Sequence, residues 1–334
     1  MTASDPREAL SQLIFGHVPA RAVQAAAELG LADLIASGTT SAESLAEAVG
    51  ANVDALRRLM RFLVSLGVFD RGESGYALTA MGDLLRSDVA GSQRPTARLS
   101  ANSFSAWSEI LHTIRTGESG YQKYYGKPMF EHMAEDPERA AVFDAAMTAI
   151  HGAESAAMLD AYDFNDIGRL VDVGGGNGSL LAATLERHPA MQGMVFDLPH
   201  VAERAAAAIE AAGLGDRCEA VGGSFFETVP AGADAILLRH IIHDWSDADA
   251  VRILGNCARA VAPSGRVLVV EMLVPEGNGP SLAKRFDLSM MVLPGGVERT
   301  EAEYRTLFEA AGLTLSGITP TASPSFVIEG RPAT

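Results

Sequence analysis

The sequence predicts an α/β fold in which a mostly parallel sheet, with helices on both faces, follows an N-terminal helical region. From Ile167 onward, short apolar runs alternate with helical patterns, which is typical of parallel strands joined by crossover helices. Four glycines within 174–178 separate one apolar run from the helical pattern after it. The last two apolar runs, near 313–319 and 324–330, are separated by too short a turn for a crossover, so we expect an antiparallel hairpin.

The N-terminal region has the pattern of a winged helix. Residues 8–36 carry apolar positions at helical spacing, and we expect one helical run punctuated by proline and glycine. Thr40 and Glu43 have the spacing of a capping box, which predicts a helix that continues through Val49. The expected elements after it are a helix over 52–66 and short strands at 67–70 and 75–79.

Winged helices usually bind DNA, and this requires a basic face. Arg57, Arg58 and Arg61 supply only a modest one, in a chain with 42 acidic and 26 basic side chains and a net charge of −16. Such a surface repels phosphate backbones, so we expect no nucleic-acid partner. The apolar N-terminal helices instead predict a dimerisation module and a homodimer.

Composition also limits location and metal binding. No stretch of about 18 uninterrupted apolar residues occurs, and the N-terminus lacks the basic and apolar regions of a signal peptide. We therefore expect a cytoplasmic protein with no membrane partner. Cys218 and Cys257 have no metal-ligand spacing, so we expect reduced packing residues and no metal. The predicted domains are a dimerisation domain at 1–95, a helical linker or lid at 96–160 and a catalytic sheet domain at 161–334.

The helical region at 96–160 is rich in aromatic and Met side chains. At helical spacing such residues usually form a core, but they also suit the wall of a pocket for a planar substrate. Both interpretations stay open at this point. The candidate pocket residues are Phe130, Phe143, Met147, Met290 and Met291. Together they indicate a substrate that is a flat, mostly apolar, hydroxylated aromatic compound.

The glycine cluster predicts a ligand site of a particular charge. A dinucleotide fingerprint that began at Gly174 would require a third glycine at the position of Ser179. Asp172, two residues before the first glycine, disfavours an anionic pyrophosphate and favours an ammonium or sulfonium group. Asp197 follows Asp172 by 25 residues at the end of the next apolar run, the range at which an acid binds a ribose diol. Together these residues predict S-adenosylmethionine as the ligand.

A second polar group follows the fourth apolar run. His243 lies just beyond that run, Glu271 ends the next one, and Glu298 precedes a further helix start. A buried carboxylate requires a partner, so we expect both acids to converge on His243. For Glu298, a favourable charge at a helix start is the competing interpretation. For His240, three residues before His243, we expect a structural role.

Five segments together resemble the motif set of the small-molecule O-methyltransferases, which include plant caffeate and isoflavone enzymes and bacterial enzymes of natural-product pathways. The resemblance covers nearly the whole chain. It implies a Rossmann-like class I methyltransferase sheet with an antiparallel last strand, an N-terminal dimerisation domain, and S-adenosyl-L-methionine as cofactor with S-adenosyl-L-homocysteine as product. The segments are 172–178, 196–201, 243–247, 270–271 and 295–300.

The resemblance implies roles for individual positions. His243 matches the catalytic base, Glu271 and Glu298 match the acids that orient its imidazole, and Asp244 lies beside the substrate. A phenol, with a pKa of about 10, is mostly un-ionised at neutral pH, so a base is needed as its oxygen attacks the methyl group. An amine needs less help from a base, which is why these residues favour O-methylation over N-methylation.

The resemblance also implies the cofactor contacts. Ser224 stands where the family has an aspartate that binds the adenine amine, and Phe225 stands in place of a methionine. A serine hydroxyl accepts a hydrogen bond without charge, so we expect weaker cofactor binding than is usual in the family. Arg239 replaces a lysine. The implied cofactor-binding residues are Asp172, Gly174, Gly176, Asp197, Leu198, Ser224, Phe225, Arg239 and Trp245.

Alternatives from other classes stay open on the sequence. Relatives of this fold methylate nitrogen, or use S-adenosylmethionine in hydroxylation or decarboxylation without transferring its methyl group. A winged-helix regulator would bind duplex DNA at physiological salt. A NAD-dependent dehydrogenase would be stabilised by NAD and not by S-adenosylmethionine.

Overall fold

The computed structural model describes residues 5–333, and the chain in it divides into two compact units. The first unit contains the chain up to Phe104 together with Met133–Gly152, and the second contains Ser105–His132 and the chain from Ala153 onward. The helical segment expected at 96–160 therefore contributes to both units. The domain boundaries at 95 and 160 stay a prediction.

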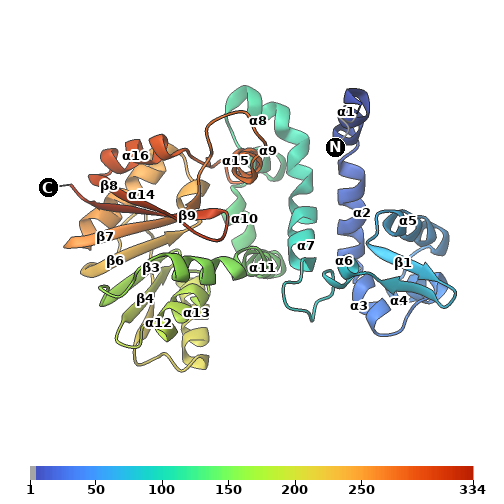
Figure 1. Cartoon of the computed structure of the whole chain (residues 1–334), viewed down its shortest axis with the longest axis horizontal. Coiled ribbons are helices and arrows are strands. Elements are labelled where there is room, and N and C mark those ends of the chain that lie inside the picture. The colour runs from blue at the N-terminus through green and yellow to red at the C-terminus, as the bar shows by residue number, and fades with distance from the viewer. Residues whose placement is uncertain (1–4, 334) are drawn as a thin grey trace. The chain divides into compact units, whose positions relative to one another are not determined.

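The N-terminal part of the first unit begins with three helices, so the expectation of one run over 8–36 is wrong. The chain turns at Gly16 and again at Gly30, where a φ of 64° places the backbone in the left-handed region that glycine adopts without strain. The helices are α1 (Pro6–Ile14), α2 (His17–Glu28) and α3 (Leu31–Ala36) (Figure 1).

The helix–helix–hairpin order that follows matches the expectation, apart from one cap. Ser41, not Thr40, caps the next helix, because the Ser41 side chain accepts the N–H of Ser44 while the Thr40 hydroxyl donates to the Ser74 carbonyl. The capping box predicted from Thr40 is therefore wrong. The elements are α4 (Ala42–Val49), α5 (Val53–Ser65), β1 (Phe69–Gly72), β2 (Gly75–Leu78) and α6 (Ala80–Asp83).

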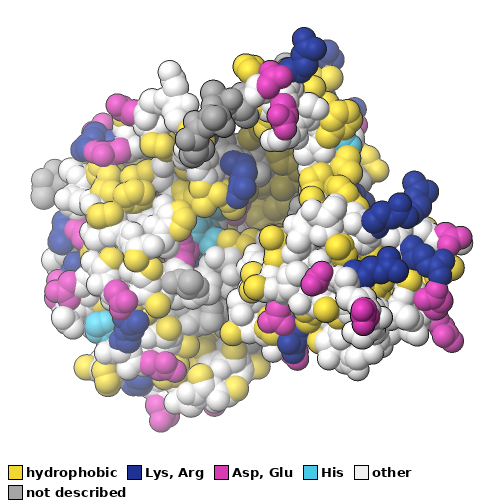
Figure 2. Space-filling model, turned by 45° about the vertical axis from the view of Figure 1, so that its right-hand side comes forward, with side chains coloured by type: hydrophobic (Ala, Val, Ile, Leu, Met, Phe, Trp, Pro, Cys, Tyr) yellow, Lys and Arg dark blue, Asp and Glu magenta, His cyan; other side chains and the backbone are white. Residues whose placement is uncertain are grey.

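The expected basic face on α5 is partly neutralised. Arg57 forms ion pairs with Glu43 and Asp54, which leaves Arg58 and Arg61 as the remaining cations of that face. On the face of the molecule shown in Figure 2, acidic side chains likewise lie beside basic ones. A surface of mixed charge differs from the basic face that DNA binding requires.

The segment between the N-terminal elements and the sheet is helical, as expected. Within the described part of the chain, no helix is both long enough and apolar enough to cross a membrane. The helices are α7 (Arg94–Ser103), η1 (Phe104–Glu109), α8 (Ile110–Thr116), α9 (Gly120–Tyr125), α10 (Met129–Ala134) and α11 (Pro137–Ala161).

The second unit contains a seven-stranded sheet in the order β5-β4-β3-β6-β7-β9-β8. Every pairing is parallel except those of β9, which runs antiparallel to both β7 and β8, so the predicted terminal hairpin is confirmed. In the β7–β9 register, Glu271 lies opposite Phe326. The strands are β3 (Arg169–Val173), β4 (Gln192–Asp197), β5 (Cys218–Gly222), β6 (Ala233–Arg239), β7 (Val261–Met272), β8 (Leu313–Pro320) and β9 (Ser325–Pro332).

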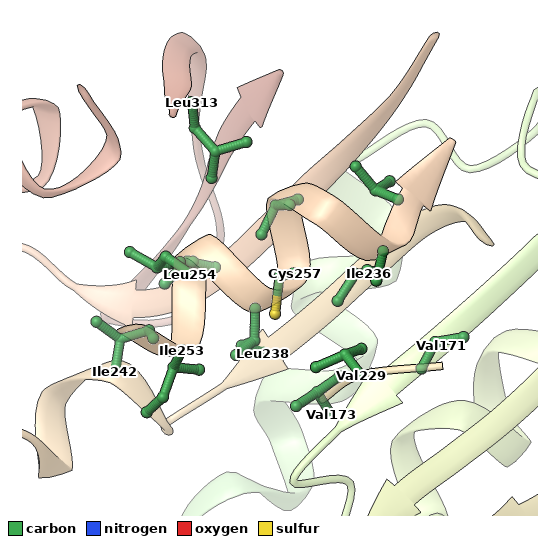
Figure 3. Packing of buried hydrophobic residues seen from close by; sticks show 14 of the residues in the cluster. Val171, Val173, Val229, Ile236, Leu238, Ile242, Ile253, Leu254, Cys257 and Leu313 are labelled. Carbon is green, nitrogen blue, oxygen red and sulfur yellow. The ribbon is translucent and has the colours of Figure 1, made fainter. Parts of the chain in front are cut away.

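Helices cover both faces of this sheet, because its strands present apolar side chains on both sides. Ile236 and Leu238 of β6 pack in one core with Cys257 (Figure 3), while Leu237 packs in the core on the opposite face. Cys218 and Cys257 are free and buried, which confirms them as packing residues. The helices are α12 (Ser179–Arg187), α13 (Pro199–Ala211), η2 (Ile242–Asp244), α14 (Asp247–Ala260), α15 (Leu282–Val292) and α16 (Glu301–Ala310).

Candidate active site

The glycine cluster forms a tight turn between β3 and α12. The Gly174 N–H donates to the Phe196 carbonyl at 2.8 Å, and a Cβ at Gly174 would lie 2.3 Å from the Cδ1 atom of Ile241. Gly176 also has a positive φ, but no heavy atom lies within 4 Å of the position of its absent Cβ. The turn is thus packed against the protein at Gly174 and open at Gly176, the arrangement that lets a backbone contact a ligand closely.

Two carboxylates lie at the ends of the neighbouring strands β3 and β4. Asp197 accepts the Gly176 N–H at 2.9 Å and the Leu198 N–H at 2.7 Å, so it ties the glycine turn to the next strand. Asp172 is 2% exposed, and within residues 5–333 no hydrogen bond to its carboxyl group is present. Burial raises the pKa of Asp172 to about 7, although the charge of Arg239 lowers it.

This geometry fits a cationic ligand group. Burial disfavours the ionised form of the Asp172 carboxyl group, and a positive charge beside it would stabilise that form. Arg239 acts on Asp172 through its charge, while its guanidinium donates a hydrogen bond to the Ser155 hydroxyl at 2.8 Å. An ammonium or sulfonium group suits the environment of Asp172.

An aromatic cluster surrounds Trp245, just after η2. The Trp245 ring centroid lies 4.7 Å from that of Phe226, 5.9 Å from that of Phe225 and 6.1 Å from that of Phe130. Ser224 begins the Phe225–Phe226 turn, and its hydroxyl accepts the Phe226 N–H at 3.3 Å. The structure thus brings three predicted site residues, Phe130, Phe225 and Trp245, into one cluster and places Ser224 beside it in the chain.

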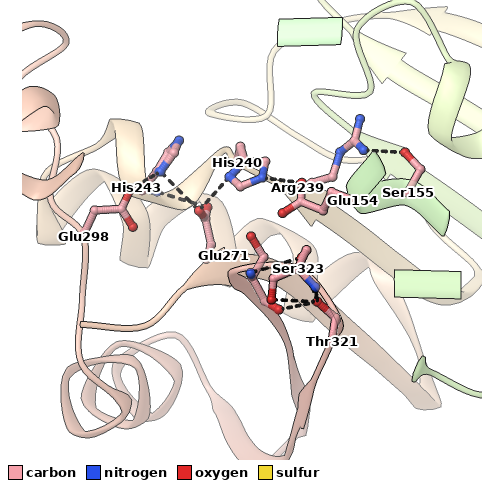
Figure 4. Close-up of polar contacts among 10 residues, drawn as sticks. Glu154, Ser155, Arg239, His240, His243, Glu271, Glu298, Thr321 and Ser323 are labelled. Atoms are coloured by element: carbon pink, nitrogen blue, oxygen red, sulfur yellow. Dashed lines mark hydrogen bonds and ion pairs between the residues drawn. The ribbon is translucent and has the colours of Figure 1, made fainter. Parts of the chain in front are cut away.

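His243 lies in η2, and both predicted acids converge on it (Figure 4). Its Nδ1 atom is 2.7 Å from Glu298 Oε1 and 3.2 Å from Glu271 Oε2, and its backbone N–H donates to Glu271 Oε1 at 3.3 Å. The Nε2 atom is 3.7 Å from Asp244 Oδ1. The helix start after Glu298 has its own capping box, between Thr300 and Glu303. Contact with His243, rather than a helix-start charge, therefore accounts for Glu298.

The environment of His243 shifts its proton affinity strongly. Burial disfavours the imidazolium, but the carboxylates of Glu271, Asp244 and Glu298 outweigh burial and raise the pKa of His243 to about 10. Burial raises the pKa of Asp244 to about 7 in spite of the His243 charge. Burial disfavours the ionised form of Glu271, but His243 and His240 together more than offset burial, so the pKa of Glu271 is lowered. The cluster therefore has a high affinity for a proton at His243.

Arg299 was missed as a site residue by the sequence reasoning. Its side chain is 1% exposed and bridges both sides of the His243 segment, because it donates to the carbonyls of Ile242 at 3.1 Å and Trp245 at 2.8 Å. It also donates to Asp247 at 2.8 and 3.0 Å. The only signal in the sequence was its position next to Glu298 in the 295–300 segment. Arg299 fixes the backbone that carries the imidazole.

Gly296 allows the same segment to approach His243. The N–H of the next residue, Val297, donates to the His243 carbonyl at 2.8 Å. A Cβ at Gly296 would lie 2.0 Å from that carbonyl oxygen, a distance that no side chain tolerates. The pairing of the two segments therefore depends on glycine at this position.

His240, for which we expected a structural role, lies in contact with two carboxylates near His243. It has a φ of 54°, which is unusual for a residue other than glycine. Its Nε2 atom is 2.7 Å from Glu154 Oε2, and its Nδ1 atom is 3.4 Å from Glu271 Oε2. His240 thus belongs to the same buried cluster as His243.

The candidate pocket residues are divided between the two units. Phe130, Met290 and Met291 belong to the unit that contains His243, whereas Phe143 and Met147 lie on α11 within the first unit. The role of all five in acceptor binding stays a prediction.

Models of two protein families match the chain. The O-methyltransferase domain matches residues 107–314, and the O-methyltransferase dimerisation domain matches residues 11–88. Among curated proteins, the chain is 41% identical over 325 residues to phenazine O-methyltransferase PhzM of Lysobacter antibioticus, covering 97% of this chain and 95% of that protein. It is also 37% identical over 306 residues to aclacinomycin 10-hydroxylase RdmB of Streptomyces purpurascens, covering 88% and 81%.

Two solved structures also match nearly the whole chain. The crystal structure of LaPhzM matches with a TM-score of 0.94 and 40% identity, covering 98% of this chain and 99% of that one. The structure of NcsB1, an O-methyltransferase from neocarzinostatin biosynthesis in complex with S-adenosylmethionine and 2-hydroxy-5-methyl naphthoic acid, matches with a TM-score of 0.87 and 37% identity, covering 94% and 96%.

Proposed function

Because the chain belongs to the O-methyltransferase family, we propose that it methylates a hydroxyl group of a small aromatic natural product, with His243 as general base. The observation that carries this proposal is the convergence of Glu271 and Glu298 on the Nδ1 atom of a buried histidine. That convergence leaves Nε2 as the atom that can receive a proton from an acceptor.

The cofactor that the proposal requires is S-adenosylmethionine. When bound, it supplies a methyl group on a positively charged sulfur and leaves as S-adenosylhomocysteine. Asp172 offers a buried carboxyl group to a ligand cation, and the open side of Gly176 offers backbone without steric obstruction. Asp197 holds this turn and ends the adjacent strand, where a ribose diol would be bound.

His243 removes the proton from the acceptor hydroxyl. With Nδ1 protonated and donating to Glu298, the neutral imidazole presents a lone pair at Nε2. Burial lowers the pKa of His243, but the neighbouring carboxylates raise it to about 10, close to that of a phenol, so the neutral form that accepts the proton is a small fraction near neutral pH and turnover should rise with pH. The acids then stabilise the imidazolium that forms, while Arg299 and Gly296 keep its backbone in place.

We infer that the acceptor is a flat aromatic phenol. Aromatic and Met side chains, among them Phe130, Met290 and Met291, belong to the same unit as the base. The phenazine and naphthoic-acid compounds named for the relatives are planar aromatics, which supports this class.

We also propose a homodimer formed through the N-terminal helices. Four large apolar side chains between the middle of α1 and the residue just after it are exposed, namely Leu10, Leu13, Ile14 and Phe15. A mass by light scattering equal to that of one chain at micromolar concentration would contradict this part of the proposal.

The test combines binding and product analysis. We expect calorimetry to detect binding of S-adenosylmethionine and S-adenosylhomocysteine, and mass spectrometry of a phenol panel to detect a product heavier by one methylene group. His243→Ala should lose most of the turnover and still bind S-adenosylhomocysteine, while His188→Ala, outside the cluster, should keep both. Wild-type turnover by His243→Ala would overturn the proposed base. A hydroxylated product without methyl transfer would instead favour the chemistry of the hydroxylase relative.

A further inference from the structure

Two buried residues outside the proposed base and its acids form a second imidazole–carboxylate pair. His240, at the end of β6, and Glu154, on α11, are in contact through Nε2 and Oε2 at 2.7 Å. Their side chains are 9% and 7% exposed, so the contact is shielded from water. The mechanism above uses neither residue.

This pair is joined to the base through one shared atom. Glu271 Oε2 lies 3.4 Å from His240 Nδ1 and 3.2 Å from His243 Nδ1, so a single carboxylate oxygen lies between two imidazoles. Figure 4 shows the resulting succession from Glu154 through His240, Glu271 and His243 to Glu298. The two imidazole centroids are 5.3 Å apart. A positive charge on His240 is therefore close enough to His243 to lower the proton affinity of its imidazole.

We propose that the Glu154–His240 pair positions Glu271 and, through the charge on His240, lowers the pH at which His243 can accept the substrate proton. The inference rests on the proposed role of His243 as base. Glu154 lies on the far side of His240 from Glu271, so the pair presents its positive end to Glu271 and His243. A positive charge this close disfavours a second imidazolium.

The direction of the effect follows from the groups that surround both imidazoles. Carboxylates outnumber the other charges here, and they raise the pKa of His243 against the effect of burial. His240 supplies the opposing positive charge, and the contacts with Glu154 and Glu271 raise its own pKa against the effect of burial. Within the described part of the second unit, the titratable and charged groups around the two rings are Glu154 of α11, Arg239 of β6, Glu271 of β7, Asp244 of η2, Glu298 and Arg299 before α16, and Tyr304 of α16.

The backbone at His240 supports a specific role. A φ of 54° is unfavourable for histidine, and asparagine or glycine would adopt it with less strain. The strained conformation at this position accompanies the placement of the ring between the Glu154 and Glu271 carboxylates. Asparagine is accordingly the suitable neutral replacement, because it relieves the backbone while it removes the charge.

The test is the pH dependence of kcat/KM, measured with the phenol that the panel identifies. We expect the midpoint of the rising limb in His240→Asn to move upward on the order of one pH unit, which is about a tenfold loss of kcat/KM below the midpoint. His240→Lys, which restores a positive charge, should return the midpoint toward the wild-type value. His188→Asn, a half-buried histidine on the same unit, is the matched control and should leave the profile unchanged.

A loss of rate by the same factor at every pH, with an unchanged midpoint in His240→Asn, would mean a purely structural role and overturn the proposal. Binding of S-adenosylhomocysteine and thermal unfolding verify that each variant is folded. If His240→Asn does not fold, nitrogen-15 NMR of the wild-type complex with S-adenosylhomocysteine measures whether the His240 ring is protonated. A His240 ring that is neutral at neutral pH would overturn the inference.

Failure of this inference is distinguishable from failure of the proposed function. Full turnover by His243→Ala would remove the base and leave the NMR titration of His240 unaffected. A normal loss in His243→Ala together with an unshifted profile in His240→Asn would leave the base in place and remove only the role of His240.

Discussion

Gly296→Ala is the substitution that most directly tests how the His243 segment is held. The added Cβ would lie 2.0 Å from the His243 carbonyl oxygen, 2.6 Å from the Asp244 carbonyl carbon and 2.7 Å from the Asp244 Cα atom. All three are backbone atoms, so no side-chain rotation relieves the overlap. An ordinary contact requires the two segments to separate by more than about 1 Å, which breaks the hydrogen bond from the Val297 N–H to the His243 carbonyl.

The magnitude follows from that displacement. Forcing an extra methyl group into a packed site costs about 1–3 kcal/mol of unfolding free energy. Moving a catalytic group by about 1 Å lowers kcat on the order of 100-fold. Binding of S-adenosylhomocysteine should change by less than about threefold, because Asp172 and Asp197 lie on other strands.

The matched control is Gly279→Ala. Gly279 has an ordinary φ and no heavy atom within 4 Å of its Cβ position, so the same change there should alter neither kcat nor stability. The assay compares kcat of both variants with the phenol identified for the wild type, alongside urea unfolding. A kcat for Gly296→Ala within threefold of that for Gly279→Ala would refute the view that close backbone approach sets the place of His243.

Three further predictions concern the charges and hydrogen bonds of the site. Glu298→Gln should move the rising limb of the kcat/KM profile to lower pH and reduce its maximum about tenfold or more, because the carboxylates outweigh burial in raising the pKa of His243. A pH profile of the variant measures both effects, and a shift of the limb to higher pH would contradict the predicted direction. Arg299→Met should lower the unfolding free energy by about 3–5 kcal/mol, because the carbonyls of Ile242, Val297 and Trp245 lose buried donors; urea unfolding measures this, and a loss below about 1 kcal/mol would show that water replaces the guanidinium. Ser224→Asp should tighten S-adenosylhomocysteine binding about three- to tenfold by adding charge to a hydrogen-bond acceptor; calorimetry measures it, and equal or weaker binding would argue against adenine contact at Ser224.

Features of the fold that depend on local pattern could be predicted from the sequence. The alternation of apolar runs and helical patterns predicted the mostly parallel sheet, and the short connection between the last two runs required the antiparallel hairpin that β8 and β9 form. The helix starts were harder, because Thr40 and Ser41 are adjacent and both hydroxyls suit a cap. The structure distinguishes them through the competing acceptor at Ser74, which is distant in the sequence.

In the candidate site, too, the residues placed by local pattern could be predicted, and the residues that act through distant contacts could not. His243, Glu271 and Glu298 could be brought together because they lie just after a strand, at the end of a strand and before a helix, at the same edge of the sheet. Arg299 and His240 could not, because their importance arises from contacts across the fold. The Arg299 guanidinium bonds to carbonyls more than fifty residues away, and His240 contacts Glu154, 86 residues earlier. No periodicity or spacing encodes such contacts.

The position of Glu271 inside the β7 ladder has an evolutionary consequence. A strand can shift its register only by whole residues, and a shift of one would bring Val270 or Met272 to the place of the carboxylate opposite Phe326. The acid that we propose to orient the base is therefore fixed by the strand pairing of the sheet itself. Candidate acceptor contacts lie instead on helices such as α10 and α15, whose outer residues and connecting loops accept substitution readily. Descendants of such a scaffold can change their acceptor while their proton chemistry stays the same.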